Sequence, residues 1–386
     1  MSLKVAERAL VPPFIVMDVM SAAAAREATG ERVLHLEVGQ PSTGLPSAAA
    51  ARLADRIATE RLGYTVALGL PILRERIARY YQEAHGTTVS PDRILVTTGS
   101  SAAFQLAFLA AFAPGDRVGV AAPGYPAYRH ILKALGVEPV TLPVGPDSRY
   151  QPTVAVLEAS GERLDGLILA SPSNPTGTVI PPEDLRALTA WCDDRGVRLI
   201  SDEIYHGIVY GEPALSAAGL TPNALVINSF SKYYAMTGWR LGWMVAPPDM
   251  IRPLECLAQN MFISAPTLSQ YAGLYAMDCI EELEANVARY AANRALLLKT
   301  LPKAGFDRLA PADGAFYLYA DVSRLTNDSA DFCARMLRET GVAATPGLDF
   351  DAEQGHRFVR FSFAGATDDM EEAADRLTAW MGRIGA

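Results

Sequence analysis

The sequence predicts an α/β protein in which a large domain, built on a mostly parallel sheet sandwiched by helices, is joined to a smaller α+β domain. From about residue 90, short β-branched apolar runs alternate with amphipathic stretches, which is the pattern of a parallel sheet covered on both faces. After Pro248, long helical stretches precede two strands, and such segregation is typical of α+β structure. A chain of 386 residues with 50% hydrophobic side chains can bury a sizeable core.

The apolar runs are the expected strands of the large domain. They are ILVTT (94–98), VGVAAP (118–123), LILASP (167–172), VRLIS (197–201), ALVINSF (224–230) and RLGWMVAP (240–247). Helical patterns follow the first three, in the stretches SAAFQLAFLAAF, AYRHILKALG and EDLRALTAWCDDRG. This alternation predicts helices on both faces of the sheet.

The second domain is expected from about residue 285 to the end. Two long helical stretches, MIRPLECLAQNM and TLSQYAGLYAMDCIEELEANVARYAANRALLLKT, precede the strands FYLYADV and FVRFSFA, which flank the helix SADFCARMLRETG. The N-terminal stretch VMDVMSAAAAREATG has helical composition but no adjacent strand, so it returns to the small domain, contacts a partner subunit, or does both. We therefore expect a large domain over 45–284 and a small domain made of 1–44 and 285–386.

Composition and charge narrow the classes of function. Lys and Arg number 34 against 43 Asp and Glu, a net charge of −9, whereas nucleic-acid binding relies on a basic surface. The longest apolar stretch, 102–114, is too short to span a bilayer, and the N-terminus lacks the apolar core of a signal peptide. The four cysteines are far apart with no CxxC pair. We expect a cytoplasmic protein without a metal site, bound to neither nucleic acid nor membrane.

Small and polar residues follow successive strands of the predicted sheet. In chain order they are Gly99-Ser100-Ser101, Tyr125, Asn174, Asp202 and Lys232. Taken singly, the first group can be a helix cap, Asn174 a turn residue and Asp202 part of a solvated acidic pair. Because ligands bind outside the carboxyl ends of the strands in doubly wound sheets, we expect these residues to form one site.

Lys232 is the most informative of these residues. It follows an apolar strand and precedes the mostly uncharged YYAMTGW, which disfavours a solvated surface position. Desolvation lowers the pKa of a lysine toward nucleophilic or Schiff-base chemistry. Arg240 starts the next strand and can neutralise a phosphate through two hydrogen bonds. A lysine, a carboxylate, an aromatic face and a phosphate cradle together indicate pyridoxal phosphate as the cofactor.

Eight motif blocks run in order along essentially the whole chain. They are VGQPSTGLP (38–46), GYTVALGLPILRERIA (63–78), TTGSSAAFQLAF (97–108), PGYPAY (123–128), SPSNPTG (171–177), SDEIY (201–205), SFSKYYAMTGWRLGW (229–243) and FVRFSFA (358–364). SNPTG and SDEIY are weak motifs singly, whereas the SFSK…GWRLG block is specific. Together the blocks resemble the class I/II aminotransferases, which are fold type I pyridoxal-phosphate enzymes related to aspartate aminotransferase.

The resemblance implies roles for residues around the cofactor ring. Lys232 is similar to the Schiff-base lysine that moves a proton between the substrate Cα and the cofactor. Asp202 resembles the acid that keeps the pyridine nitrogen protonated. Asn174 and Tyr205 are similar to the pair that hydrogen-bonds the phenolic oxygen, and Tyr125 to the aromatic residue that stacks on the ring. The expected catalytic residues are therefore Lys232, Asp202 and Tyr205.

The resemblance also implies where the phosphate and the substrate bind. The phosphate is expected on Gly99, Ser100, Ser101, Ser229, Ser231 and Arg240. Tyr64 resembles a tyrosine that reaches the phosphate from the other subunit, which implies a homodimer with shared active sites. Arg360 is similar to the arginine that clamps the substrate α-carboxylate, with the backbone of Gly39 and the amide of Asn174 assisting.

The activity implied by the resemblance is transfer of an amino group between an L-amino acid and a 2-oxo acid in two half-reactions, a function in amino-acid metabolism. A β-eliminating C–S lyase on the same scaffold is the alternative, because the same residues serve that chemistry. Ser101 stands where aspartate-using relatives often carry a lysine, so this residue does not support aspartate as donor. If the stretch PPFIVMDVM lines the site, it favours an uncharged or aromatic donor.

Overall fold

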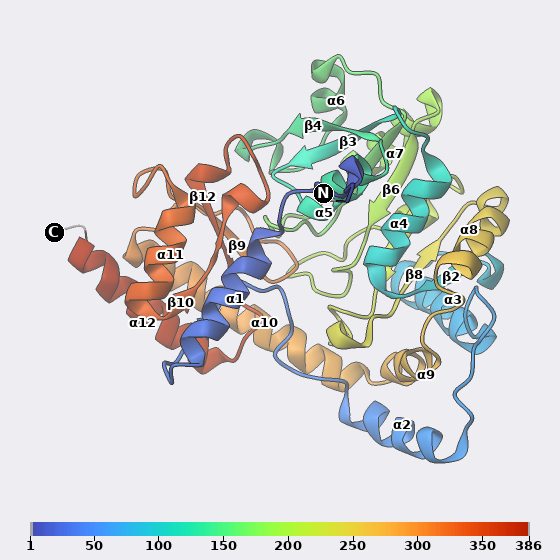
Figure 1. The fold of residues 1–386 in the computed structure, drawn as a ribbon, viewed down its shortest axis with the longest axis horizontal. Helices are drawn as coiled ribbons and strands as arrows, with labels where there is room; N and C mark the ends of the chain where they lie inside the picture. Colours follow the sequence, from blue (N-terminus) through green and yellow to red (C-terminus); the bar gives the residue numbers. More distant parts are fainter. Residues whose placement is uncertain (1–2, 385–386) are drawn as a thin grey trace.

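A seven-stranded sheet forms the centre of the larger part of the protein in the computed structural model, which describes residues 3–384 (Figure 1). The strand order is β2-β8-β7-β6-β5-β3-β4. The strands are β2 (Ile94–Thr97), β3 (Arg117–Ala122), β4 (Glu138–Pro143), β5 (Gly166–Ala170), β6 (Arg198–Asp202), β7 (Leu225–Ser229) and β8 (Gly242–Val245). Neighbours are parallel except at β8, which is antiparallel to β2 and β7. The predicted mostly parallel sheet is confirmed.

Sequence analysis missed the strand β4 and the direction of β8. β4 has the sequence EPVTLP and pairs only with β3, at the edge of the sheet. An edge strand tolerates proline, but proline obscures the strand pattern in the sequence. The antiparallel direction of β8 has a consequence for the site, because it brings Arg240, just before the strand, to the edge at which the parallel strands end.

Helices cover both faces of this sheet. Side chains alternate between the faces along each strand, so that in β5 Ile168 packs on one side while Leu167 and Leu169 pack on the other. The helices around Ile168 are α4 (Gly99–Ala111), α5 (Pro126–Ala134) and α8 (Pro248–Met261). The helices whose side chains join the opposite core are α2 (Ser47–Thr59), α3 (Pro71–His85), α6 (Val154–Ser160), α7 (Pro182–Arg195) and α9 (Thr267–Ala276).

The long helix expected from residue 267 onward is two helices. α9 ends at Ala276 and α10 runs over Ile280–Thr300. Between them Asp278 accepts hydrogen bonds from Arg52 of α2 and Arg76 of α3. These contacts hold a bend that the local composition does not reveal, because tertiary contacts override helix propensity.

Two small sheets are built mainly from strands of the C-terminal part of the chain (Figure 1). The first contains β9 (Tyr317–Asp321), β11 (Thr345–Pro346) and β12 (Phe358–Ser362), all antiparallel; the second pairs β1 (Leu34–His35) in parallel with β10 (Val342–Ala343). Side chains of α10, α11 (Ser329–Thr340) and α12 (Thr367–Ile384) share one apolar core with them. The N-terminal segment therefore returns to this part through β1. The predicted boundary at residues 284 and 285 falls inside α10, and the division into domains stays a prediction.

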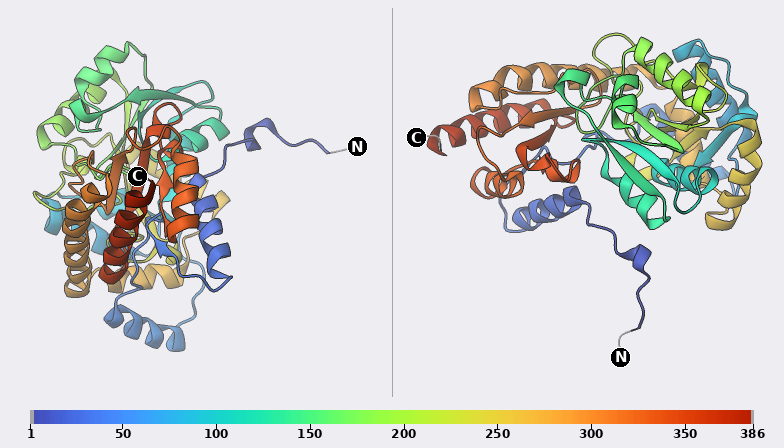
Figure 2. Two further views of the ribbon diagram at one scale, coloured as in Figure 1. Left: turned by 90° about the vertical axis from the view of Figure 1, so that its left-hand side faces the viewer. Right: turned by 90° about the horizontal axis from the view of Figure 1, so that it is seen from above.

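The N-terminal helix α1 (Ile15–Glu27) packs on the C-terminal part of the chain. Ala23 joins a small cluster with Leu337, and Arg26 donates hydrogen bonds to the carbonyls of Leu337 and Arg338. The described residues nearest the N-terminus project from the body of the protein (Figure 2), whereas the short turn η1 (Glu7–Ala9) contacts α5. Within residues 3–384, no helix combines the length and the apolar character that crossing a bilayer requires.

Candidate active site

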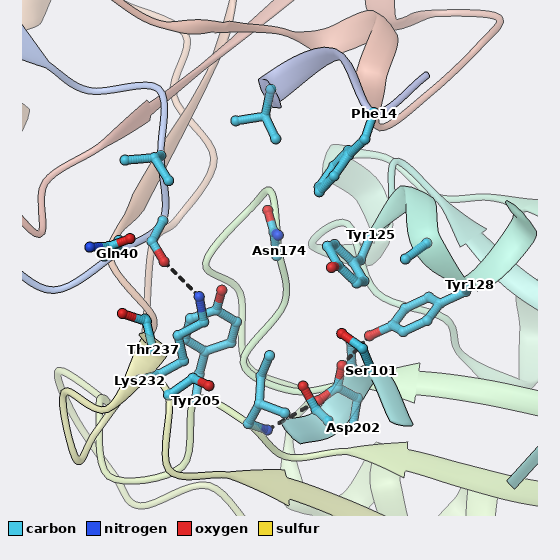
Figure 3. A pocket seen from close by; sticks show the side chains of 18 of the residues that line it. Phe14, Gln40, Ser101, Tyr125, Tyr128, Asn174, Asp202, Tyr205, Lys232 and Thr237 are labelled. Carbon is cyan, nitrogen blue, oxygen red and sulfur yellow. Dashed lines mark hydrogen bonds between the residues drawn. The ribbon is translucent and has the colours of Figure 1, made fainter. Parts of the chain in front are cut away.

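A pocket lies at the carboxyl edge of the seven-stranded sheet, where side chains from the large sheet, the small sheet and α1 converge. Figure 3 shows side chains of the large sheet and its loops facing this pocket, with Phe14 at the start of α1. Most of the predicted site residues line it, although they are spread over the chain. They are Gly39, Ser100, Ser101, Tyr125, Asn174, Asp202, Tyr205, Ser231, Lys232, Arg240 and Arg360. The parallel topology explains this convergence, because consecutive strands deliver their following loops to one edge.

Three predicted residues do not line the pocket. Gly99 begins α4 with a φ of +77°, and a Cβ there would lie 2.5 Å from Nη2 of Arg240, so the position requires glycine. Ser229 is buried behind Ser231 and donates a hydrogen bond of 2.9 Å to its Oγ. Tyr64, in the connection between α2 and α3, is 83% exposed.

Lys232 reaches across the pocket from the loop after β7. Its Nζ donates a hydrogen bond of 2.6 Å to the carbonyl of Gly39 (Figure 3). Burial, with the positive charges of Arg360 and Arg240, lowers the pKa of Lys232 to about 8. At pH 7 roughly a tenth of this amine is therefore uncharged, and this fraction can act as a nucleophile or a base.

Asp202, the last residue of β6, is a buried carboxylate at the floor of the pocket. It accepts hydrogen bonds from the hydroxyl of Tyr128 and, at 3.1 Å, from the N–H of Ile204. Burial raises the pKa of Asp202 to about 6, and the two hydrogen bonds limit the rise. The group is an anion at neutral pH, so it can stabilise a cationic ligand atom in the pocket.

Two tyrosines are hydrogen-bonded to each other beside the lysine. The hydroxyls of Tyr205 and Tyr317 are 2.7 Å apart, and the Nζ of Lys232 lies 5.7 Å from the centre of the Tyr205 ring. Burial raises the pKa of Tyr205 well above its ordinary value, so its hydroxyl stays a hydrogen-bond donor. Tyr125, whose pKa burial raises to about 12, presents a second aromatic ring to the pocket.

Arg360, in the middle of β12, carries a buried positive charge with uncharged partners. One terminal nitrogen donates to Oδ1 of Asn174 at 2.8 Å, and the other donates to the backbone carbonyl of Glu37. The guanidinium carbon lies 4.4 Å from the centre of the Tyr317 ring. Among the described residues, nothing accepts a hydrogen bond from Nε. Such a guanidinium is suited to a carboxylate ligand.

The start of α4 forms a site for an anion. Thr98, which precedes this helix, provides no side-chain cap within the described part of the chain, so the N–H groups of Ser100 and Ser101 can bind a ligand. Arg240 lies beside Gly99 and donates a hydrogen bond of 2.9 Å to the carbonyl of Thr237. A helix N-terminus and a guanidinium together suit a phosphate.

Apolar side chains of α1 and of Phe14, the residue directly before it, form another wall of the pocket. We call this surface the α1 wall; it consists of Phe14, Val16, Met17 and Met20. All four belong to the stretch PPFIVMDVM. Phe14 points toward Tyr125, with ring centres 5.8 Å apart in an edge-to-face arrangement (Figure 3). The wall offers an apolar surface to whatever the pocket binds.

Sequence analysis missed several residues that line the pocket, among them Gln40, Tyr128, Thr237 and Tyr317. Tyr128 had a usable signal, since it lies three residues after Tyr125, in the first turn of the helical stretch expected from Ala127. Tyr317 had none, because within FYLYADV it is one aromatic residue of an apolar strand.

The fold and this constellation define an aminotransferase scaffold. Residues 31–377 match the family described as Aminotransferase class I and II. The chain belongs to this family, as its motifs indicated, and it is an aminotransferase with an aspartate aminotransferase-like fold.

Known proteins extend the similarity over the whole chain. The valine–pyruvate aminotransferase of Mycobacterium tuberculosis (strain ATCC 25618 / H37Rv) is 54% identical over 382 residues, which are 98% of this chain and 98% of the relative. An aminotransferase crystal structure from Mycobacterium tuberculosis matches with a TM-score of 0.97 and 54% identity, covering 99% of this chain and 100% of that one. The aspartate aminotransferase of Thermus thermophilus with maleate matches with a TM-score of 0.92 and 29% identity, covering 98% and 100%.

Proposed function

We propose that the protein is a pyridoxal-phosphate-dependent aminotransferase that takes its amino group from a small aliphatic L-amino acid, valine first, and transfers it to pyruvate. The observation that carries this proposal is one pocket that combines a buried arginine, suited to an α-carboxylate, with the apolar α1 wall, suited to an aliphatic side chain. A relative at 54% identity that is a valine–pyruvate aminotransferase supports the donor and the acceptor.

The residues at the sheet edge fit the phosphate of the cofactor. Ser100 and Ser101 would bind it through their N–H groups, and Arg240 through its guanidinium, with the hydroxyl of Ser231 beside them. Ser229 would act by holding Ser231. The clearance at Gly99, where a Cβ would collide with Arg240, supports this assignment, because it lets the guanidinium lie against the helix start.

The residues at the floor of the pocket fit the ring of the cofactor. Asp202 is buried and ionised at neutral pH, which suits pairing with a protonated ring nitrogen. The Tyr205 hydroxyl stays protonated and can donate a hydrogen bond, and the Asn174 amide offers another polar group, which suits a phenolic oxygen. Tyr125 would pack its ring on the cofactor ring.

Bound at Lys232, pyridoxal phosphate supplies an electron sink for negative charge on the substrate Cα. Once the amine of the substrate has replaced Lys232 on the cofactor, the freed amine of Lys232 would be the base that moves the proton at Cα. Its lowered pKa, about 8, allows it to accept that proton when uncharged and to return it when charged. Arg360 and Asn174 would hold the α-carboxylate and so orient the Cα–H bond toward Lys232.

The side chain of the donor would contact the α1 wall. Val16, Met17 and Met20 offer only apolar atoms, and Ser101 offers no charge for a distal carboxylate. Burying the methyl groups of valine against these side chains gains roughly 0.8 kcal/mol per buried methylene-sized group. A charged side chain would lose solvation in the same place.

We also propose a homodimer with shared active sites. Tyr64 supports this proposal. Its large aromatic side chain is 83% exposed in the single chain and would be covered by contact with a second copy. Tyr64 of the partner subunit would reach the phosphate. If the fully active holoenzyme sediments as a monomer, that result would contradict the proposed dimer.

The first experiment is the visible absorption spectrum of the protein loaded with pyridoxal phosphate, recorded while single amino acids are added without an oxo acid. We expect a yellow band that valine bleaches and pyruvate restores. Absence of the band would contradict the cofactor. A band that alanine or aspartate bleaches but valine does not would contradict the donor, and release of ammonia or a thiol would favour the lyase.

A further inference from the structure

We propose that Asp349 is a positioning residue that sets the preference for side-chain size, because its carboxylate holds the start of α1, and with it the α1 wall, over the pocket. Asp349 ends the short turn η7 (Gly347–Asp349) between β11 and β12. The expected direction of the effect rests on the proposed aliphatic donor, whereas the contacts of Asp349 do not depend on it.

The carboxylate of Asp349 caps α1 from far along the chain. Oδ1 accepts the N–H of Ile15 at 2.9 Å, and Oδ2 accepts the N–H of Val16 at 3.3 Å. Phe14, the residue at the N-cap position, makes no side-chain cap for the helix within the described chain. Asp349 is only 1% exposed, so water does not compete for these N–H groups. A carboxylate here also complements the positive end of the helix.

The capped start of α1 carries three residues that line the pocket. Val16 is capped itself, Phe14 directly precedes the capped Ile15, and Met17 directly follows Val16, so all three lie within one helical turn of the carboxylate. Any displacement of the helix start moves their side chains with it. The cap therefore fixes the α1 wall at its end nearest to Tyr125, where the ring of Phe14 packs.

The segment that contains Asp349 also contacts other elements that surround the pocket. Arg129 of α5 donates to the carbonyl of Asp349 at 2.5 Å, and the N–H of Gly124 donates to the carbonyl of Phe350 at 3.1 Å. The ring of Phe350 lies with its centre 4.7 Å from the guanidinium carbon of Arg360. One short segment thus contacts the helix start, the loop before Tyr125 and the proposed carboxylate-binding arginine.

These contacts fix the space between the α1 wall and Arg360, which is the space available to a side chain. The methyl group of alanine is too short to depend on the wall, whereas longer side chains extend toward it. Asp349→Asn keeps the size of the residue, but its amide has one acceptor oxygen, so it can satisfy only one of the two N–H groups and directs a donor at the other. The variant loosens the helix start and leaves Arg360 and Lys232 in place. The charge that it removes also acts on Arg360, and that effect is shared by all the amino acids, because each carries the same α-carboxylate.

The test compares single half-reactions of the wild-type and Asp349→Asn holoenzymes with alanine, valine, leucine and phenylalanine. We expect the apparent kcat/KM for the three longer amino acids to fall about tenfold, mainly through a higher KM, while alanine changes less than about twofold. Amide hydrogen exchange should speed up at Ile15 and Val16. The matched control is Asp328→Asn, which alters a carboxylate that accepts the N–H groups of Ala330 and Asp331 at the start of α11.

The outcomes separate this inference from the proposed function. Equal losses for alanine and the longer amino acids, or unchanged exchange at the start of α1, would overturn the role of Asp349, as would the same selectivity change in Asp328→Asn. A wild-type enzyme that does not favour valine overturns the proposed donor instead. In that case the ratio of leucine or phenylalanine to alanine still decides whether Asp349 sets side-chain preference.

Discussion

The two sides of the pocket are built differently. The floor and the phosphate end come from the ends of strands of the large sheet and from the loops that follow them, such as Asp202 at the end of β6 and Lys232 after β7. The side proposed for the substrate combines α1 and β12, from near the two ends of the chain. A sheet of seven strands positions the first side, whereas contacts over more than three hundred residues, such as Ile15 to Asp349, position the second.

The chemistry of the two sides differs as well. The cofactor side carries Asp202, Lys232 and Arg240, all charged or titrating near neutral pH, while the α1 wall is apolar and Arg360 is its charged neighbour. Substitutions on the first side should therefore affect every amino acid alike. Substitutions in the α1 wall should change which amino acid is used, and substitutions of Arg360 should change the preference for donors that carry a carboxylate.

Lys232→Ala is expected to have the largest effect. Without the amine there is no base at the substrate Cα and no attachment point for the proposed cofactor, so turnover should fall by about 10⁴-fold or more. The loss should be the same for alanine and valine. Half-reaction rates measure it, with the exposed Lys303→Ala as control. Retained transamination in Lys232→Ala would contradict the assignment.

Arg360→Lys comes next, because lysine keeps the charge but loses the planar pair of donors. We expect kcat/KM for amino acids to fall by about 10²- to 10³-fold, mostly through KM. A donor that lacks the carboxylate, such as isobutylamine, should change little. If the amine and valine lose rate by the same factor, Arg360 does not bind the carboxylate, and the division between the two sides must be redrawn.

Tyr128→Phe should have a smaller, pH-dependent effect confined to the cofactor side. The hydrogen bond from Tyr128 lowers the pKa of Asp202, which burial raises to about 6, so its removal raises that pKa further. Because only the ionised carboxylate pairs with a cationic ring, affinity for pyridoxal phosphate is lost as pH falls through this pKa. The midpoint of the loss should move up by about one pH unit.

Titration of the apoprotein with pyridoxal phosphate between pH 5.5 and 8.5 measures this shift. Tyr210→Phe is the control, since it also removes a hydrogen-bonded tyrosine hydroxyl, which is half-buried and donates to the carbonyl of Ala315 at 2.7 Å. An unchanged midpoint in Tyr128→Phe would mean that the hydrogen bond does not tune Asp202.

The difference between the two sides also explains how much the sequence could predict. Strand ends follow from apolar periodicity, and a residue after a strand has only one edge of the sheet to occupy, so Asp202 and Lys232 could be placed together from pattern alone. Arg240 was expected beside a phosphate, although the antiparallel direction of β8, which brings it there, was not foreseen.

The remaining features depend on contacts that no local pattern contains. The bend between α9 and α10 is held by arginines of other helices on Asp278, and Tyr317 becomes a pocket residue only because β9 pairs with β12. Asp349 is one of many acidic residues until the fold brings it to the start of α1. The resemblance of the FVRFSFA block to the family motif predicted the role of Arg360. The same resemblance contains no information on the helix cap.

Met20→Ala is expected to have the smallest effect and probes the α1 wall with its cap intact. Removing part of one apolar surface should lower kcat/KM for valine about threefold and raise it for leucine or phenylalanine, whose larger side chains gain room. Affinity for pyridoxal phosphate and its pH dependence should stay unchanged, because Met20 belongs to α1 and not to the strand ends and loops that carry the groups proposed to bind the cofactor. Ser21→Ala, on the exposed side of the same helix, is the control. A changed cofactor affinity in Met20→Ala would show that the two sides are coupled, and the effects of Asp349→Asn would then have to be measured on both.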